Sequence, residues 1–206
     1  MSRSQEVEPL EDRLVAAALH LLQDHPAERL SLRAVAHHVE VSHQAPYVYF
    51  ANKRVMLAAV AGAGLQHAAQ RAAEAVAAAR TPTERLHALV DAYVAFVREQ
   101  PHVHDLAFGP LVKKSDHPRL EQSAKTYWDQ LHDVVAACQP HGVGEAEVLG
   151  RCVATWGTVQ GISRLQMHGQ IPASVPAPLD DLVHGAVETL RRGWQAGNDN
   201  PGPLRR

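Results

Sequence analysis

The chain has few of the residues on which metal centres, disulfide frameworks and membrane spans depend. It contains two cysteines, Cys138 and Cys152, without any Cys-x-x-Cys spacing. Neither a zinc site nor a disulfide framework is therefore expected, and a reducing compartment fits this cysteine content. No apolar run approaches the roughly 20 residues that a membrane-spanning helix needs. Because residues 1–13 are charged throughout, we expect no secretory signal and a cytoplasmic protein.

Aromatic residues and runs of β-branched residues are also scarce. Only 5% of the chain is Phe, Trp or Tyr, whereas the helix formers Ala and Leu are abundant. This composition predicts an all-α protein. With 206 residues, of which 46% are hydrophobic, the chain can bury a good core as one large domain or as a small domain joined to a larger one.

The motifs of the common enzyme classes are missing as well. The chain has no Gly-rich phosphate loop, no His-Glu-x-x-His, no nucleophile elbow and no convincing pair of carboxylates at ligand spacing. We therefore predict no catalytic residue and no cofactor. An all-α enzyme or metal protein that uses the histidines stays as an alternative, which metal bound to the purified protein would favour.

Histidine, by contrast, is unusually frequent, with 14 in the chain. Adjacent residues on a helix, such as His37 and His38, point to different faces, and the His-x-His spacing of His102 and His104 is similarly splayed. With Asp105, the latter pair is the nearest approach to a ligand cluster. Because these spacings spread the side chains apart, we predict no metal site and expect most histidines at the surface or in the core.

The formal net charge of −2 argues against a generally basic nucleic-acid-binding protein, but the charge is unevenly distributed. Residues 1–28 contain two basic and six acidic residues. Residues 29–54 contain one acidic residue, Glu40, and four basic residues, Arg29, Arg33, Lys53 and Arg54. An anionic partner is therefore expected to bind between residues 29 and 54.

Apolar spacing and capping residues predict four helices in the first 80 residues. The first is expected at about 9–24, before the break at Pro26. The next three are each preceded by a suitable N-cap, and they are expected at 32–39 after Ser31, at 43–50 after Ser42 and at 53–80 after Asn52. Two short helices joined by a tight turn are typical of a helix-turn-helix module.

Helical signals continue through the rest of the chain. Thr81 and Glu84 form a Thr-x-x-Glu capping box before a helix at 82–99. Further helices are expected at about 102–108, 117–138, 145–168 and 178–195. Within the helix at 53–80, Gly62 and Gly64 fit either a hinge or close helix packing.

The last two predicted helices carry more apolar surface than one core requires. The helix at 145–168 is apolar around much of its circumference, and the helix at 178–195 carries one apolar stripe. Such breadth is expected where a helix is buried both by its own core and by a partner chain. The predicted dimer-interface residues are Val159, Ile162, Leu182, Ala186 and Leu190.

The stretch VSHQAPYVYFANKR, residues 41–54, contains three of the chain's seven Tyr and Phe residues. Phe50 is expected to be its inward anchor. The side chains of His43, Gln44, Tyr47 and Tyr49 are candidates for solvent or a ligand. Glutamine pairs bidentately with adenine, histidine bonds to base edges, and tyrosine hydroxyls suit phosphate oxygens.

Basic residues flank this stretch. Lys53 and Arg54 begin the helix at 53–80, where unpaired backbone N–H groups already favour a phosphate. Arg33 opens the helix at 32–39 and can reach a second phosphate. DNA is the partner that requires both an anion-binding face and side chains that form hydrogen bonds with base edges.

The run LSLRAVAHHVEVSHQAPYVYFANKRVMLAAV, residues 30–60, resembles the DNA-binding region of the TetR/AcrR family of transcriptional regulators. The matching residues are Leu32, Arg33, Val35, Ala36, Val41, Ser42, Tyr47, Phe50, Lys53 and Leu57. The resemblance implies that His43, Gln44 and Tyr47 lie in the major groove of DNA. It implies that Arg33, Tyr49 and Lys53 hold the DNA backbone, and Ser42 belongs to the same predicted DNA-binding set.

Two residues depart from the family pattern. Glu40 stands where the family usually has glycine in the turn, which costs about 1 kcal/mol if that backbone is left-handed. Pro46 lies inside the predicted short helix and removes one helical hydrogen bond, so an irregular helix start is expected. These departures are the support for a further alternative, a ligand-binding helical dimer that does not recognise DNA.

A weaker resemblance covers TWGTVQGISRLQMHG, residues 155–169, which is similar to a Trp-Gly, then His-Gly signature in one branch of this family. Gln160 stands in place of a signature histidine. Aromatic residues suit the lining of an apolar cavity, although each is also a common core residue. The predicted ligand-pocket residues are Tyr93, Phe96, Phe108, Trp128, Trp156 and Gln160.

Taken with the helical pattern, the resemblance implies a helix-turn-helix DNA-binding domain at 1–56 and an effector-binding and dimerisation domain at 57–196. Residues 197–206 are expected to be disordered. The implied function is that of a homodimeric, sequence-specific DNA-binding repressor, which a small-molecule effector releases from a palindromic operator. Double-stranded operator DNA, a second copy of the chain and an unknown effector are the predicted partners.

Overall fold

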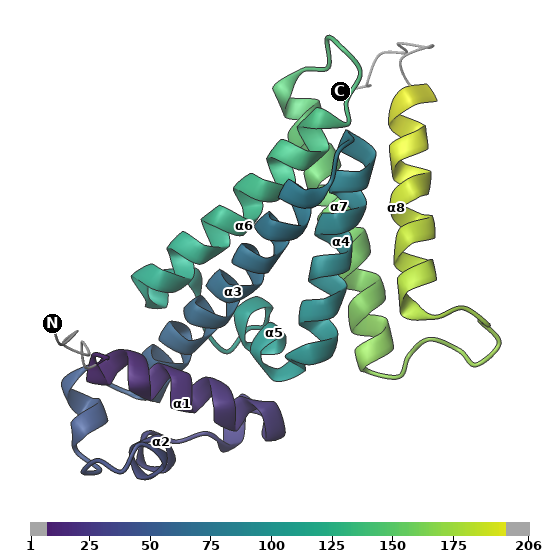
Figure 1. Ribbon diagram of the computed structural model, residues 1–206. Coiled ribbons are helices and arrows are strands. Elements are labelled where there is room, and N and C mark those ends of the chain that lie inside the picture. Colours follow the sequence, from purple (N-terminus) through teal and green to yellow (C-terminus); the bar gives the residue numbers. More distant parts are fainter. Residues whose placement is uncertain (1–7, 197–206) are drawn as a thin grey trace, which may run out of the picture. The chain divides into compact units, whose positions relative to one another are not determined.

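The computed structural model describes residues 8–196, so the predicted disordered tail at 197–206 lies outside the described residues. Within this range the chain forms eight α-helices and three short 3-10 helices and no strand, which confirms the all-α prediction (Figure 1). The α-helices are α1 Leu10–Asp24, α2 Leu32–His38, α3 Lys53–Ala78, α4 Pro82–Glu99, α5 Pro101–Phe108, α6 Pro118–Ala137, α7 Glu145–Met167 and α8 Leu179–Ala196. The 3-10 helices are η1 Ala27–Arg29, η2 Ala45–Val48 and η3 Lys114–Asp116.

Three of the four predicted helix caps are present, and the predicted side-chain cap at Ser42 is not. The Ser31 hydroxyl accepts a hydrogen bond from the Ala34 N–H at 3.1 Å, and the Asn52 side chain accepts one from the Val55 N–H at 3.1 Å. At the start of α4 the Thr81 hydroxyl accepts from the Glu84 N–H, while the Glu84 carboxylate accepts from the Thr81 N–H, both at 3.1 Å. Each such cap contributes about 1 kcal/mol, so these helices begin where the sequence predicts.

The predicted short helix at 43–50 is wrong in type. The segment forms the 3-10 helix η2, Ala45–Val48, and Ser42 contributes its main-chain carbonyl to the Ala45 N–H. Pro46 is the physical reason, because it has no N–H to donate to an α-helical ladder. The Pro46 carbonyl instead accepts from the N–H groups of both Tyr49, at 3.1 Å, and Phe50, at 2.9 Å.

Contacts divide the described chain into two compact units. The first comprises the residues up to His67 together with Glu99–Tyr127, and the second comprises Ala68–Arg98 together with the residues from Trp128 onward. The first unit therefore contains the predicted helix-turn-helix segment and also α5 and the start of α6. The predicted domain boundary between residues 56 and 57 does not coincide with this division and stays a prediction.

The first unit is held together by a core of fully buried side chains from α1, α2 and α3, together with Phe50 between η2 and α3. Two glycines of α3 explain how α5 and α6 approach it. A Cβ atom at Gly62 would lie 2.6 Å from the Leu120 nitrogen, and one at Gly64 would lie 2.3 Å from Cγ1 of Val103. Close helix packing thus accounts for both glycines. The largest members of the core are Leu14, Leu22, Val35, Phe50, Met56, Leu57, Val60 and Leu65.

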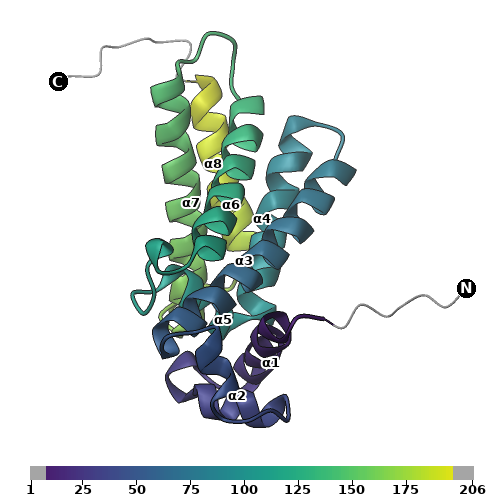
Figure 2. The same cartoon turned by 90° about the vertical axis from the view of Figure 1, so that its left-hand side faces the viewer.

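The second unit is a bundle of helices in which α7 and α8 pack against each other (Figures 1 and 2). Polar contacts tie α4 to α8. The Arg98 guanidinium donates to both carboxylate oxygens of Asp180, at 2.8 and 2.9 Å, and His184 lies 2.5 Å from the Asp91 carboxylate.

Burial raises the pKa of the Cys152 thiol in α7 to about 11, which fits a structural residue. None of the helices in the described part is long and apolar enough to cross a membrane.

Candidate nucleic-acid interface

The turn after α2 sets the position of the segment that follows it. Glu40 has a φ of 59°, and it is the one non-glycine residue with positive φ in the described range. The Val41 N–H donates to the Ala36 carbonyl at 3.0 Å, and the Glu40 N–H donates to the His37 carbonyl at 3.1 Å. These two bonds form a Schellman motif, in which glycine is the usual residue at the left-handed position. Glu40 therefore holds a strained backbone, as the sequence comparison with the family pattern implied.

Two buried residues anchor the segment after the turn. Pro46 is buried, and Phe50 has no exposed surface, which confirms the prediction that Phe50 is the inward anchor. The residues between these anchors face outward: 52% of Tyr47, 79% of Val48 and 42% of Tyr49 are exposed. The segment between the buried Pro46 and Phe50 thus presents the exposed side chains of residues 47–49 outward.

Three of the other predicted DNA-binding residues lie on the same stretch of chain, directly before η2. Ser42, His43 and Gln44 are all exposed. Arg33 is exposed on α2. We name the surface formed by residues 42–44 and 47–49 the recognition segment. Sequence reasoning missed Val48, whose exposure follows from the 3-10 geometry and has no signal in residue type.

The basic residues at the start of α3 have partners within the chain. The Lys53 ammonium donates to the Glu28 carbonyl at 2.7 Å, which leaves two of its three protons for other acceptors. Arg54 lies 3.7 Å from the Asp116 carboxylate, and its own side chain is largely exposed. Lys53 is thus held in place beside the N-terminus of α3, where unpaired N–H groups favour an anion.

The predicted ligand-pocket residues divide between the two units. Phe108 belongs to the first unit, where its ring centroid lies 5.0 Å from that of His104. The other five belong to the second unit: Tyr93 and Phe96 are buried, and Trp128, Trp156 and Gln160 are half-buried. The rings of Trp128 and Trp156 meet edge to face with centroids 6.2 Å apart. Their role in a ligand pocket stays a prediction.

The predicted dimer-interface residues differ in exposure. Val159 is buried within the chain, whereas Ile162, Leu182, Ala186 and Leu190 are half-buried. Three exposed apolar residues of α7, which lie four or more residues apart, are not among the predicted interface residues, although they belong to the broad apolar surface predicted for this helix: Leu149, 38% exposed, Val153, 56% exposed, and Leu165, 44% exposed. Gly157 and Gly161 continue the same spacing between them, and a Cβ atom at either would have no neighbour within 4 Å.

Residues 8–196 contain no group of three or more His, Cys, Asp or Glu side chains that could hold a metal ion. His104 is buried, and its Nδ1 lies 3.8 Å from the Asp105 carboxylate. His102, His104 and Asp105 therefore do not converge on one point.

A strained tight turn between α2 and an outward-facing recognition segment defines this protein as a helix-turn-helix DNA-binding protein. Two family models match the sequence. The model described as "Bacterial regulatory proteins, tetR family" covers residues 14–60, and the model described as "Tetracyclin repressor-like, C-terminal domain" covers residues 86–190. The chain belongs to the TetR family, and it is a DNA-binding transcriptional regulator.

Solved structures share the fold over nearly the whole chain. A protein of unknown function from Rhodococcus sp. RHA1 is 25% identical, with a TM-score of 0.76 over 94% of this chain and 99% of that one. The transcriptional regulator FadR from Bacillus subtilis, in complex with stearoyl-CoA, is 15% identical, with a TM-score of 0.67 over 88% and 98%. A TetR/AcrR family regulator from Thermobifida fusca YX-ER1 is 17% identical, with a TM-score of 0.61 over 90% and 98%. No curated protein matches the sequence.

Proposed function

We propose that the protein is a homodimeric repressor, which binds a palindromic operator through its recognition segment and which a small-molecule effector releases. The observation that carries this proposal is the outward presentation of Tyr47 and Tyr49 beside His43 and Gln44, above the buried Pro46 and Phe50. A packing role for the two tyrosines would require them to be buried. Their exposure leaves them available to DNA.

The exposed side chains suggest a division of roles on the operator. Gln44 can bond bidentately to adenine, and His43 and Tyr47 reach neighbouring base edges in the major groove. Arg33, Ser42, Tyr49 and Lys53 hold phosphates, which fixes the register of the protein on the duplex without specifying sequence. Lys53 suits this role because its hydrogen bond to the Glu28 carbonyl already orients its ammonium group.

The homodimer is proposed to form through α7 and α8 of each subunit, as a four-helix bundle. The exposed apolar side chains of Leu149, Val153 and Leu165 support this, because water contact with them is unfavourable in a lone subunit. Gly157 and Gly161 would let a partner helix approach closely. Two recognition segments would then meet half-sites spaced by about one helical turn, roughly 34 Å, or a multiple of it.

Effector control is proposed to follow from linkage between two sites. An effector that prefers a conformation with wrongly spaced recognition segments must weaken DNA binding by the same factor as DNA weakens effector binding. The protein is proposed to belong to the branch with the Trp-Gly/His-Gly signature. Its proposed effector contacts are the paired rings of Trp128 and Trp156 and the nearby signature residue Gln160. The protein is proposed to work in the cytoplasm and without catalysis.

Binding of the purified protein to DNA that flanks its own gene, at two salt concentrations and against an unrelated duplex, tests this proposal. The protein is expected to prefer the flanking DNA, and Tyr47→Ala and Gln44→Ala are expected to lose that preference by about 1–3 kcal/mol. Gln66→Ala, which changes an exposed glutamine of α3, is the matched control. Lys53→Gln should weaken binding to both duplexes and lower the salt slope by about one.

The outcome that refutes DNA recognition has two parts. The protein would bind both duplexes equally and lose that binding at moderate salt, and selection from random duplexes would also yield no preferred sequence. Tight binding of an effector by the same preparation would then favour the ligand-binding dimer without DNA recognition.

A further inference from the structure

The first unit contains a hollow of about 250 Å³ between α1, α3 and α5, which no predicted residue role uses. Its apolar wall consists of Ala16, Leu19 and Leu22 of α1, Gly64 of α3 and Val103 of α5. At Gly64 the side chain of Val103 approaches so closely that a Cβ atom would lie 2.3 Å from it. The helices thus touch at this glycine, and the hollow lies beside the contact.

The rim of the hollow is polar. His20, Gln23 and His67 are exposed there, and Gln100 is half-buried. Within the described chain, the side chains of Gln23, His67 and Gln100 form no hydrogen bond or ion pair, so their donors and acceptors are available to a ligand. No Lys, Arg, Asp or Glu lines the hollow. An ionised ligand would therefore lose hydration without gaining a charged partner, whereas an uncharged ligand would not.

The size of the hollow further restricts the range of ligands that it can hold. Sites for drug-sized ligands begin at about 300 Å³. The hollow is smaller, and its apolar wall with hydrogen-bonding groups at the rim suits a single ring that carries one or two polar substituents. We propose that this hollow is a binding site for a small uncharged molecule with a ring-shaped apolar body and a hydrogen-bonding group that meets the rim.

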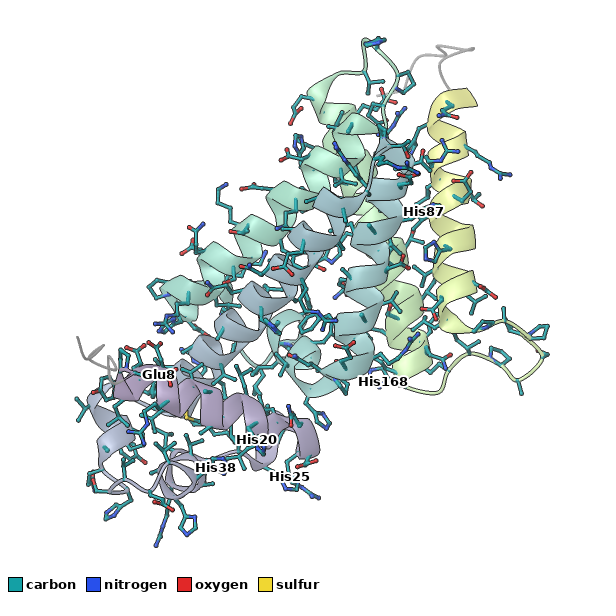
Figure 3. The ribbon with its side chains drawn as sticks, in the orientation of Figure 1. Glu8, His20, His25, His38, His87 and His168 are labelled. Atoms are coloured by element: carbon teal, nitrogen blue, oxygen red, sulfur yellow. The ribbon has the colours of Figure 1, made fainter. Side chains whose placement is uncertain are left out.

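His20 connects the hollow to the helix-turn-helix. Its ring contacts that of His38 at a tilt of 34°, with centroids 5.2 Å apart, and Figure 3 shows the two side chains together between α1 and α2. His38 is the last residue of α2 and lies two residues before the strained Glu40. A ligand that bonds to His20 therefore acts on one of the contacts between α1 and the end of α2, and through it changes DNA affinity. This last step rests on the proposed function.

Binding of ring-shaped probes to the full chain without DNA tests the site itself. Benzamide and phenol are the uncharged probes, and benzoate and benzylammonium are charged counterparts of similar size. Ligand-observed NMR is expected to show binding of the uncharged probes at roughly millimolar concentration, the range of small fragments. The charged counterparts should bind at least about tenfold more weakly than the uncharged probes, because the hollow offers them no opposite charge.

Ala16→Phe places a ring into the hollow from an exposed position, and Ala73→Phe makes the same change at an exposed alanine of α3 outside it. Ala16→Phe should weaken benzamide binding about tenfold or more, and Ala73→Phe should leave it unchanged. The double variant Gln23→Leu/His67→Leu keeps the apolar wall and removes two polar groups from the rim, so it should weaken benzamide binding. It tests the site independently if Ala16→Phe does not fold. Failure of both uncharged probes to bind would overturn the site, as would equal benzamide binding by the wild type, Ala16→Phe and the double variant.

The link to DNA is measured separately, as the ratio of DNA dissociation constants with and without benzamide, in the wild type and in His20→Ala. A ratio different from one in the wild type that returns to one in His20→Ala supports the link. A ratio of one in both overturns the link while the site stands. If the protein binds benzamide in the hollow but binds no selected DNA, the proposed repressor function fails and the link fails with it.

Discussion

Tyr47 and Tyr49 of the first unit and Tyr93 and Phe96 of the second unit lie in opposite environments. In the first unit, Tyr47 and Tyr49 face outward, because Pro46 and Phe50 occupy the space beneath them. In the second unit, Tyr93 and Phe96 are themselves the buried layer. The same residue type therefore indicates a partner in one place and a core in the other. What separates the two is whether the neighbouring residues along the chain already fill the interior.

The comparison extends to exposed aliphatic residues. Val48 in the recognition segment and Val153 on α7 both expose more than half of their surface. Val48 lies among polar hydrogen-bonding groups, which suits a nucleic acid. Val153 lies between Leu149 and Gly157 on an apolar row, which suits a second helix. Different partners are thus expected for two valines of similar exposure.

The largest expected effect is a difference in the free energy of unfolding between substitutions at the buried anchor of the recognition segment and at its exposed residues. Phe50→Ala should lower the free energy of unfolding by about 3–5 kcal/mol, because it removes a fully buried ring and leaves a cavity. Tyr49→Ala, at the adjacent exposed position, should change it by about 0.5 kcal/mol or less. Urea unfolding followed by circular dichroism measures both. Equal losses would mean that Tyr49 is part of the core and that the contrast between the units is false.

A charge on the exposed row of α7 tests the second half of the comparison. Val153→Glu should convert the proposed dimer to monomers in sedimentation velocity, because the interface would bury an unpaired carboxylate at a cost of several kcal/mol. Val175→Glu is the matched control, since Val175 is an exposed valine outside α7. If the Val153→Glu protein stays dimeric, the dimer interface does not include this row of α7.

All the predicted helices except the one at 43–50 formed as α-helices, because the caps and apolar spacings that predicted them involve residues close together in the chain. The caps at Ser31, Asn52 and Thr81 lie within three residues of the N–H groups that they satisfy. Apolar periodicity likewise placed α1 and α4 to within about a residue, since it depends only on neighbouring turns. The inward role of Phe50 and the outward placement of His43, Gln44 and Tyr47 were also predicted, although the segment that carries them was expected to be an α-helix.

Features that depend on distant segments were not predictable in the same way. The role of Gly64 became clear only from its contact with Val103, nearly 40 residues later. Phe108 was grouped with Tyr93 and Trp128 by residue type, although contacts place it in the other unit. The hollow beside Gly64 has no sequence signal, because three helices far apart in the chain enclose it.

A moderate effect is expected at the turn that presents the recognition segment. Glu40→Gly should raise the free energy of unfolding by about 1 kcal/mol, because glycine adopts a φ of 59° without steric strain. Glu40→Ala keeps the Cβ atom and should give none of this gain. Thermal melts of the three proteins measure the difference. Equal gains from both substitutions would attribute the effect to loss of the charge, and the turn would then not be strained.

The smallest expected effect lies in the second unit, at Glu188 of α8. Its carboxylate accepts hydrogen bonds from Arg191 at 2.7 Å and from Arg192 at 2.8 Å, and these bonds lower its pKa from 4.5 to about 2. A carboxyl group whose pKa is lower in the folded chain stabilises the fold above pH 4.5. This contribution is lost as the pH falls from about 4.5 through about 2.

Glu188→Gln should therefore lower the Tm at pH 7 by about 1–3 °C, since ion pairs near the surface contribute little. Relative to the wild type, the difference should shrink as the pH falls towards 2. Glu121→Gln, at an exposed glutamate whose carboxylate has no partner within the described residues, controls for the loss of one charge. A Tm difference that persists at low pH would arise from packing and not from charge.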